Sequence, residues 1–192
     1  MTKDLILATK NRGKVREIKH ILNPLKFKIT SLPDLPRETG KTFEENAVRK
    51  AKTIAKNTKR LVLADDSGLE VKALKGKPGI RSARYAGPNP TTIKLCRKLL
   101  KEMKNKKDRR ARFVCVIAVA DLKKVRTVKG ICEGKVIFEM KGKHGFGYDP
   151  VFVPDGYKKT FAQMPLKLKN RISHRGKALK KAKACLDRIF AS

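Results

Sequence analysis

The chain of 192 residues carries 49 Lys and Arg against 17 Asp and Glu, a formal net charge of +32. A hydrophobic content of 40% is ordinary for a globular protein, and the length suffices for one sizeable core. The longest apolar run, 113–120, is far too short to span a bilayer, which excludes a helical integral membrane protein.

The basic residues are spread along the chain from Lys3 to Lys183 rather than gathered in one arm. A charge of this size attracts polyanions such as nucleic acid and nucleoside triphosphates. Its even spread nevertheless favours a solvated, lysine-rich surface. Only 6% of the residues are aromatic, and no nucleic-acid-binding motif is recognisable. We therefore expect nucleic acid to bind only through non-specific electrostatic association.

The cysteines are scattered and form no C-x-x-C pair, which favours reduced thiols over a zinc site or a disulfide framework. They are Cys96, Cys115, Cys132 and Cys185. The first apolar run, 5–8, has strand length and polar flanks, unlike a signal peptide. Together these features predict a cytoplasmic protein with no membrane segment.

Apolar periodicity and turn residues predict alternating strands and helices. In chain order they are a strand at 5–8, a helix that begins within 9–14, a strand near 27–30, a helix from Thr42 to about Asn57, a strand at 61–64, a helix over 91–103, strands near 112–120, 125–132, 135–138 and 150–153, and a final helix over 173–190. Segment 76–90 is predicted to be loop. This interleaving is typical of an α/β fold with a mixed sheet, and no linker divides the chain. We expect one domain over residues 1–192.

The first strand leads through a glycine turn into a helix with a lysine in its first turn. Backbone amides together with Thr9, Asn11 and Lys14 could hold phosphate oxygens there. The spacing of a Walker A loop is absent. A plain helix start in a lysine-rich chain explains the same residues, and the segment alone leaves both interpretations open.

Two adjacent carboxylates, Asp65 and Asp66, follow the apolar run 61–64, at the predicted end of a buried strand. Such strand ends often carry the active sites of α/β proteins. Because neighbouring side chains of a strand point to opposite faces, we expect only one of the two to be functional. Asp66 is predicted to be a Mg²⁺ ligand and possible general base, and Asp65 to brace the loop. An Asx-turn without chemistry is the alternative.

A second acidic cluster contains Glu38, Glu44 and Glu45. The pattern Thr42-Phe43-Glu44-Glu45 is a capping box, which accounts for Glu45. Glu38 and Glu44 stay open as candidates for a second metal ligand, with a solvated loop as the alternative for either.

Two further segments carry residues that a core does not require. In 145–150 two glycines frame an aromatic, which suits a flat ligand stacked on the ring of Phe146. In 172–176 a serine, His174 and Arg175 stand at a predicted helix start, where oxygen ligands are favoured. Lys169 precedes them. A structural histidine and a solvated arginine are the alternatives.

Six short motifs occur in the order found in one family. They are ATKNRGK at 8–14, TFEENA at 42–47, DDSGLEV at 65–71, PGIRSARYAG at 78–87, GFGYDP at 145–150 and ISHRG at 172–176. On these motifs the chain resembles the inosine triphosphate pyrophosphatase family over nearly its whole length. The resemblance implies hydrolysis of deaminated purine nucleoside triphosphates (ITP, dITP, XTP) to monophosphate and pyrophosphate. It also implies an elongated mixed sheet flanked by helices, a nucleotide cleft between two lobes, a homodimer and Mg²⁺.

The resemblance also implies a role for each site residue. The triphosphate would bind to Thr9, Asn11 and Lys14. The metal ligands would be Asp66, which is also the catalytic carboxylate, and Glu38. The rest of the nucleotide site would be Ser67, Phe146, Gly147, Tyr148, Asp149, Lys169, His174 and Arg175. The chain departs from the family pattern at 163–168 (QMPLKL), where relatives carry more acidic residues and a helix cap.

Overall fold

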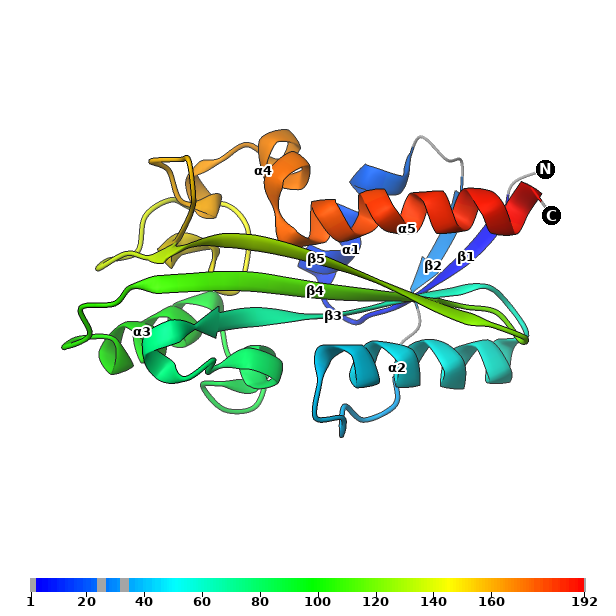
Figure 1. Ribbon diagram of the computed structural model, residues 1–192, viewed down its shortest axis with the longest axis horizontal. Coiled ribbons are helices and arrows are strands. Elements are labelled where there is room, and N and C mark those ends of the chain that lie inside the picture. The colour runs from blue at the N-terminus through cyan, green and yellow to red at the C-terminus, as the bar shows by residue number, and fades with distance from the viewer. Residues whose placement is uncertain (1–2, 24–26, 32–34, 192) are drawn as a thin grey trace. The chain divides into compact units, whose positions relative to one another are not determined.

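The computed structural model describes residues 3–23, 27–31 and 35–191. It is an α/β protein with one mixed six-stranded sheet of order β2-β1-β3-β4-β5-β6 (Figure 1). The strands are β1 (Lys3–Ala8), β2 (Phe27–Ser31), β3 (Val62–Val71), β4 (Arg110–Ala120), β5 (Val125–Val136) and β6 (Phe152–Pro154). The helices are α1 (Arg12–Leu22), α2 (Phe43–Thr58), α3 (Thr92–Glu102), α4 (Leu166–Ile172) and α5 (His174–Ala191). Strand β1 runs parallel to β2 and β3, whereas β5 and β6 are antiparallel. The predicted fold class is confirmed.

The chain divides into two compact units. Unit 1 consists of 1–66, 115–130 and 175–192, and unit 2 of 67–114 and 131–174. Strands β3, β4 and β5 contribute residues to both units. Two of the four boundaries fall within sequence motifs, between Asp66 and Ser67 and between His174 and Arg175.

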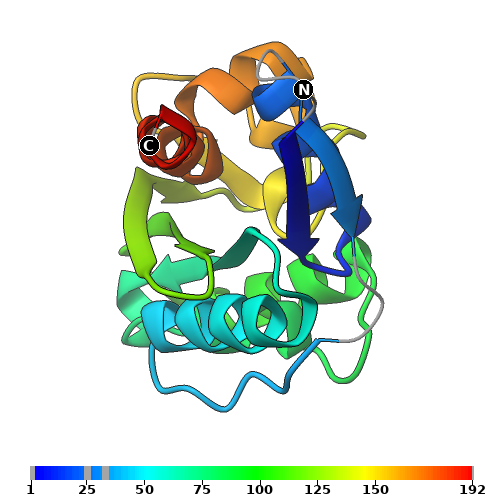
Figure 2. The ribbon, with the colours of Figure 1, turned by 90° about the vertical axis from the view of Figure 1, so that its right-hand side faces the viewer.

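In unit 1, helices cover both faces of the strands. One apolar cluster joins β1, β3 and β4 to α1 and α5, with Leu5, Ile18, Leu63, Ile117 and Leu179 all fully or almost fully buried. Helix α2 packs against β1 from the other face, and Figure 2 shows α2 and α5 on opposite sides of the strands. A strand covered on both faces can bury consecutive residues, which decides the environment of the two aspartates below.

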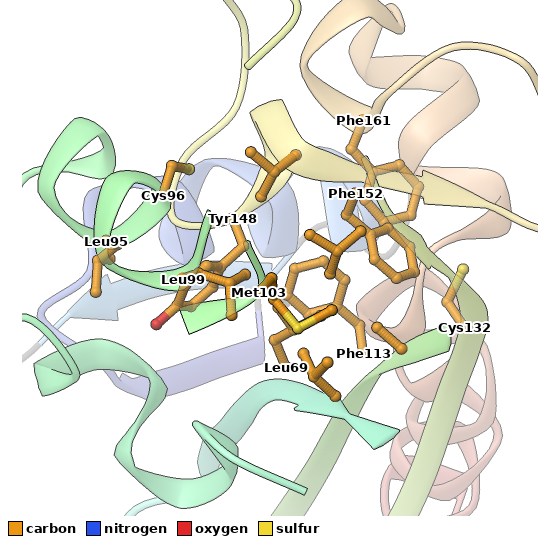
Figure 3. Packing of buried hydrophobic residues seen from close by; sticks show 14 of the residues in the cluster. Leu69, Leu95, Cys96, Leu99, Met103, Phe113, Cys132, Tyr148, Phe152 and Phe161 are labelled. Carbon is orange, nitrogen blue, oxygen red and sulfur yellow. The ribbon is translucent and has the colours of Figure 1, made fainter. Parts of the chain in front are cut away.

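The core of unit 2 gathers apolar side chains from β3, α3, β4, β5, β6 and the segment before α4 (Figure 3). At its centre three phenylalanines pack edge to face or tilted. The ring centroids of Phe113 and Phe152 are 4.7 Å apart, and those of Phe152 and Phe161 are 5.2 Å apart. Such aromatic contacts give the core directional packing beyond area burial.

The start of α2 follows the predicted capping chemistry, and the start of α1 has a side-chain cap that was not predicted. The side-chain oxygen of Thr42 accepts a hydrogen bond from the Glu45 backbone N–H at 3.1 Å, and Asn11 accepts one from Lys14 at 3.1 Å. The Glu45 carboxylate reaches the backbone N–H of Lys41 at 2.8 Å, one residue before the expected partner. The cap therefore satisfies orphan amides at the start of α2 as predicted.

Strand β3 contradicts the prediction that a strand ends at Asp65. It continues through the whole Asp65–Gly68 segment to Val71, so these residues form no Asx-turn. Strand β3 lies between β1 and β4 in the sheet, but its pairing with β1 ends at Ala64. Beyond that residue β4 is the neighbouring strand, and this tertiary environment overrides the turn preference of serine and glycine.

Smaller differences also separate the prediction from the structure. The single strand β5 covers the strand predicted at 125–132 and the first half of that predicted at 135–138. The strand predicted at 150–153 is β6, which starts at Phe152 after the 3₁₀ helix Asp149–Val151. The predicted loop 76–90 contains a 3₁₀ helix, Gly79–Arg84. The atypical segment 163–168 still starts α4, although Pro165 at its N-cap supplies no side-chain cap. Among the described helices, none combines the length and apolar character required to cross a bilayer.

Candidate active site

The turn between β1 and α1 is held by its own side chains. The Thr9 hydroxyl accepts a hydrogen bond from the Asn11 N–H at 3.3 Å, and Asn11 in turn caps α1. Thr9 is buried and Asn11 is exposed. Lys14 therefore lies in the first turn of α1, where its positive charge adds to that of the helix N-terminus. Both favour an anionic ligand.

Asp65 lies at the centre of a buried ion network on one face of unit 1. One carboxylate oxygen contacts Lys14 Nζ, and the other accepts a hydrogen bond from Arg175 Nε at 3.0 Å. Arg175 also forms an ion pair with Glu17 of α1. The Cys115 thiol donates to Asp65 as well, at 3.0 Å. Positive and negative groups alternate through the network, so each buried charge has an opposite neighbour.

This network keeps Asp65 ionised. Burial raises the pKa of its carboxyl, but the charges of Arg175 and Lys14 outweigh burial and hold the pKa well below its usual value. The side chain is inaccessible, with 1% of the residue surface exposed. Asp65 therefore serves as a structural anion that connects β3 to α1 and α5. The prediction that it braces a loop is wrong, because Asp65 lies within β3.

Asp66 has the opposite electrostatic environment, because the strand directs it away from Asp65 and toward α2. Burial raises the pKa of its carboxyl above the usual value, and nearby Glu38 raises it further, while Lys50 and Lys14 oppose the shift. Lys50 Nζ lies 3.8 Å from Asp66 Oδ1. Two adjacent carboxylates whose pKa values are pushed apart are typical of an acid–base site. Both carboxylates are buried, although they point to opposite faces of the strand, because helices cover both faces in unit 1. That only one of them is functional stays a prediction.

Lys50 is a site residue that the sequence did not reveal. From α2 it donates to the Glu38 carboxylate at 2.7 Å and to the backbone carbonyl of Asp65 at 2.8 Å. It is 4% exposed. One of many lysines in a helix of a basic chain carries no sequence signal, and only its burial distinguishes it.

The structure separates the two candidates for a second metal ligand. Glu38 is brought beside Asp66 through their shared contact with Lys50. Glu44 is exposed and instead accepts a hydrogen bond from the Thr127 hydroxyl at 2.7 Å. Within the part of the chain that the structure describes, no three His, Cys, Asp or Glu side chains form a complete metal cage.

In unit 2, the 145–149 loop folds around the Asp149 carboxylate. That carboxylate accepts a hydrogen bond from the Phe146 N–H at 2.8 Å and contacts Lys169 Nζ. Lys169 also lies 4.9 Å from the centre of the Phe146 ring. A side chain on Gly145, at φ +77°, would collide with Asp149, so glycine is required there. The loop places a half-buried aromatic ring beside a cation.

Two other predicted site residues lie in the unit 2 core. Tyr148 is 3% exposed, and its hydroxyl donates to the backbone carbonyl of Ser82 at 2.9 Å (Figure 3). His174 is also buried, and its ring stacks on Phe113 with centroids 4.5 Å apart. His174 begins α5, as predicted, and Ser67 lies half-buried in β3.

The predicted residues thus form two sets. Unit 1 holds Thr9, Asn11, Lys14, Glu38, Asp66 and Arg175, and unit 2 holds Ser67, Phe146, Gly147, Tyr148, Asp149, Lys169 and His174. The first set combines carboxylates with a lysine and an arginine, a combination that suits activation of water beside phosphate. The second combines an aromatic ring with a lysine, which suits a base.

Comparison with known proteins agrees with this chemistry. A sequence model of the Ham1 family matches residues 5–185. A Desulforamulus reducens protein named dITP/XTP pyrophosphatase is 48% identical over 97% of this chain and 96% of its own. A Bacillus subtilis protein of the same name is 44% identical over 96% and 98% of the two chains.

Solved structures give the same result. The Ham1 protein of Staphylococcus aureus superimposes with a TM-score of 0.85 at 41% identity, covering 96% of this chain and 98% of that one. A HAM1 protein from Coxiella burnetii gives a TM-score of 0.87 at 38% identity over 97% and 100% of the two chains. Since sequence and structure agree over nearly the full length, the resemblance inferred from the six motifs is confirmed and the chain belongs to the Ham1 family.

Proposed function

We propose that this protein hydrolyses deaminated purine nucleoside triphosphates (ITP, dITP, XTP) at the α-phosphorus, releasing nucleoside monophosphate and pyrophosphate. Relatives named dITP/XTP pyrophosphatase, 48% and 44% identical over almost the whole chain, support this activity. The observation that carries the proposal is the pair Asp65 and Asp66, two adjacent buried carboxylates with pKa values shifted in opposite directions.

In this proposal Asp66 orients a water molecule and accepts its proton as the water oxygen bonds to the α-phosphorus. The bond from that phosphorus to the bridging oxygen breaks, and pyrophosphate leaves with the electron pair. Lys14 and Lys50 lie within the electrostatic reach of Asp66 and would stabilise the negative charge that develops. Asp65 keeps Lys14 in place through its ion pair.

We further propose Mg²⁺ as the cofactor, held by Asp66 and Glu38. Mg²⁺ prefers oxygen ligands and is usually bound by one or two carboxylates plus substrate phosphates, and two carboxylates that share Lys50 meet that requirement. When bound, the ion would neutralise phosphate charge.

The base would stack on Phe146, beside Lys169. His174 and Arg175, which the resemblance places in the nucleotide site, would donate hydrogen bonds to the purine 6-oxygen and so select deaminated bases. Arg175 uses Nε and Nη1 for Asp65 and Glu17, so a base contact would have to coexist with that network. We also propose a homodimer, which the resemblance implies. The scattered cysteines favour a cytoplasmic location, and the even spread of basic residues favours only non-specific attraction of nucleic acid.

Substrate preference tests the activity. We expect pyrophosphate release from ITP, dITP and XTP to exceed release from ATP, because the adenine amino group would face donors meant for the 6-oxygen. One unpaired buried donor costs about 1–3 kcal/mol, or about 5- to 150-fold in kcat/KM. Equal kcat/KM for ATP and ITP, or folded protein that turns over none of these triphosphates, would contradict the proposal.

Magnesium titration tests the metal ligands. Glu38→Gln should raise the Mg²⁺ concentration for half-maximal activity about 10- to 100-fold, since one of two carboxylate ligands is lost. Glu44→Gln is the matched control and should behave as the wild type, because Glu44 bonds to Thr127. A shift for Glu44→Gln and none for Glu38→Gln would reverse the assignment.

A further inference from the structure

Helix α3 binds the middle of the 145–149 loop through both polar groups of one residue. The Gly147 N–H donates to Thr92 Oγ1 at 3.1 Å, and the Gly147 carbonyl accepts from the Cys96 thiol at 3.3 Å. Thr92 and Cys96 are four residues apart, so they lie on the same face of the helix, one turn apart. Helix and loop both belong to unit 2.

Neither Thr92 nor Cys96 is required for the formation of helix α3. Thr91 is the N-cap of α3, accepting from the Lys94 N–H at 3.3 Å, so the Thr92 hydroxyl is not required as the cap. Cys96 is fully buried, and burial, followed by the charge of Asp149, raises the pKa of its thiol to about 12. The thiol therefore stays protonated at neutral pH and can act as a hydrogen-bond donor.

Gly147 itself is suited to this double contact. Its φ of +62° lies in the left-handed region, and apart from its two chain neighbours no residue has an atom within 4 Å of where a side chain would begin. The backbone conformation, and not crowding, therefore favours glycine. The same loop is held on one side by Phe146 bonding to Asp149, and on the other by Tyr148 bonding to Ser82.

We propose that Thr92 and Cys96 are positioning residues that fix the Gly147 peptide and thereby the orientation of the Phe146 ring toward the purine base. This inference rests on the proposed function, in which Phe146 stacks on the base. Neither side chain contacts the reacting atoms, so binding and base selectivity depend on them more than the chemical step does.

Thr92→Val removes the acceptor at almost constant volume, and Thr92→Ser retains it. For Thr92→Val we expect KM for XTP to rise about tenfold and the XTP-over-ATP preference in kcat/KM to fall about tenfold, with kcat within about twofold of wild type. By NMR the Gly147 amide should exchange with solvent at least about tenfold faster, because its hydrogen bond is lost. Thr92→Ser should restore the wild-type values of all these quantities.

Two variants test the hydrogen bond from Cys96 to the Gly147 carbonyl in the same way. Cys96→Ala removes the donor, and Cys96→Ser replaces the thiol with a hydroxyl donor. Cys132→Ala is the matched control for loosening the same core, since Cys132 is buried in that cluster and its thiol faces the backbone carbonyl of Glu133, whereas the Gly147 groups bond to Thr92 and Cys96. It should change neither the XTP-over-ATP preference nor Gly147 exchange.

Three results would overturn the inference. If the Gly147 amide of Thr92→Val exchanged with solvent at the wild-type rate, the hydrogen bond to Thr92 would not hold the loop. If that amide exchanged faster while KM for XTP and the XTP-over-ATP preference stayed unchanged, the hydrogen bond would hold the loop but would not position the base. A wild-type protein without XTP or ITP turnover would overturn the proposed function, and this inference with it, and is recognised before any variant is made.

Discussion

Asp66→Asn should lower the turnover number for ITP or XTP by about 10²–10⁴-fold, the usual contribution of a general base. The amide has nearly the shape of the carboxylate but cannot accept the proton of the attacking water. It is also a weaker ligand for a hard cation, so both roles proposed for Asp66 are impaired together. Pyrophosphate release at saturating substrate and Mg²⁺ measures the effect.

The same substitution should leave the free energy of unfolding unchanged or raise it at neutral pH. The folded-state pKa of Asp66 is raised, so the folded protein binds this proton more tightly than the unfolded chain. Stability from such a group is fully present at low pH and is lost as the pH rises through the folded pKa. At pH 7 the buried carboxylate therefore destabilises the fold, and a neutral amide removes that penalty.

Thermal unfolding of metal-free Asp66→Asn, compared with wild type, measures the second effect. Asp155→Asn makes the same chemical change at an exposed position and should alter neither turnover nor the melting temperature. If Asp66→Asn kept wild-type turnover, Asp66 would not be the base. A much lower melting temperature would show that Asp66 is a structural residue instead.

The helices were predictable because their signals are local. Thr42 and Glu45 cap α2 within one turn, and the apolar stripe of α1 needs no knowledge of the rest of the chain. Such short-range patterns persist in any fold that buries the stripe.

The course of β3 was not predictable in the same way. Asp65, Asp66 and Ser67 are frequent in turns, and read locally they predict a strand end. Strand β4 continues beside the segment after the pairing with β1 ends at Ala64, and helices on both faces of unit 1 bury both carboxylates. Those neighbours come from distant parts of the sequence, so the outcome depends on tertiary structure.

In the candidate site, too, some residues were predictable from local sequence and others depend on tertiary structure. The motifs identified Asp66 and Lys14, which both lie in unit 1, because each stands in a short segment that an ordinary strand or helix does not require. Lys50 and Glu17 were missed, since each is an ordinary charged residue of an amphipathic helix. What marks them is burial against an opposite charge, a property of the folded chain alone.

Asp65→Asn should have effects on stability opposite to those of Asp66→Asn, although the two residues are neighbours. It removes the carboxylate that both Lys14 and Arg175 contact, and leaves two buried cations without that partner. Breaking a buried ion pair from one side typically costs about 3–5 kcal/mol. We therefore expect a loss of this order in the free energy of unfolding at pH 7, measured by urea denaturation of the metal-free protein.

The pH dependence of that loss separates charge from packing. The pKa of Asp65 is lowered in the folded state, so its contribution is fully present above its unfolded pKa, about 3.9, and is lost as pH falls through the folded pKa. The difference between wild type and Asp65→Asn should stay constant between about pH 5 and 8 and shrink below about pH 4. A difference that persists in acid would mean that asparagine disturbs the packing around Cys115, and not that a buried charge pair is lost.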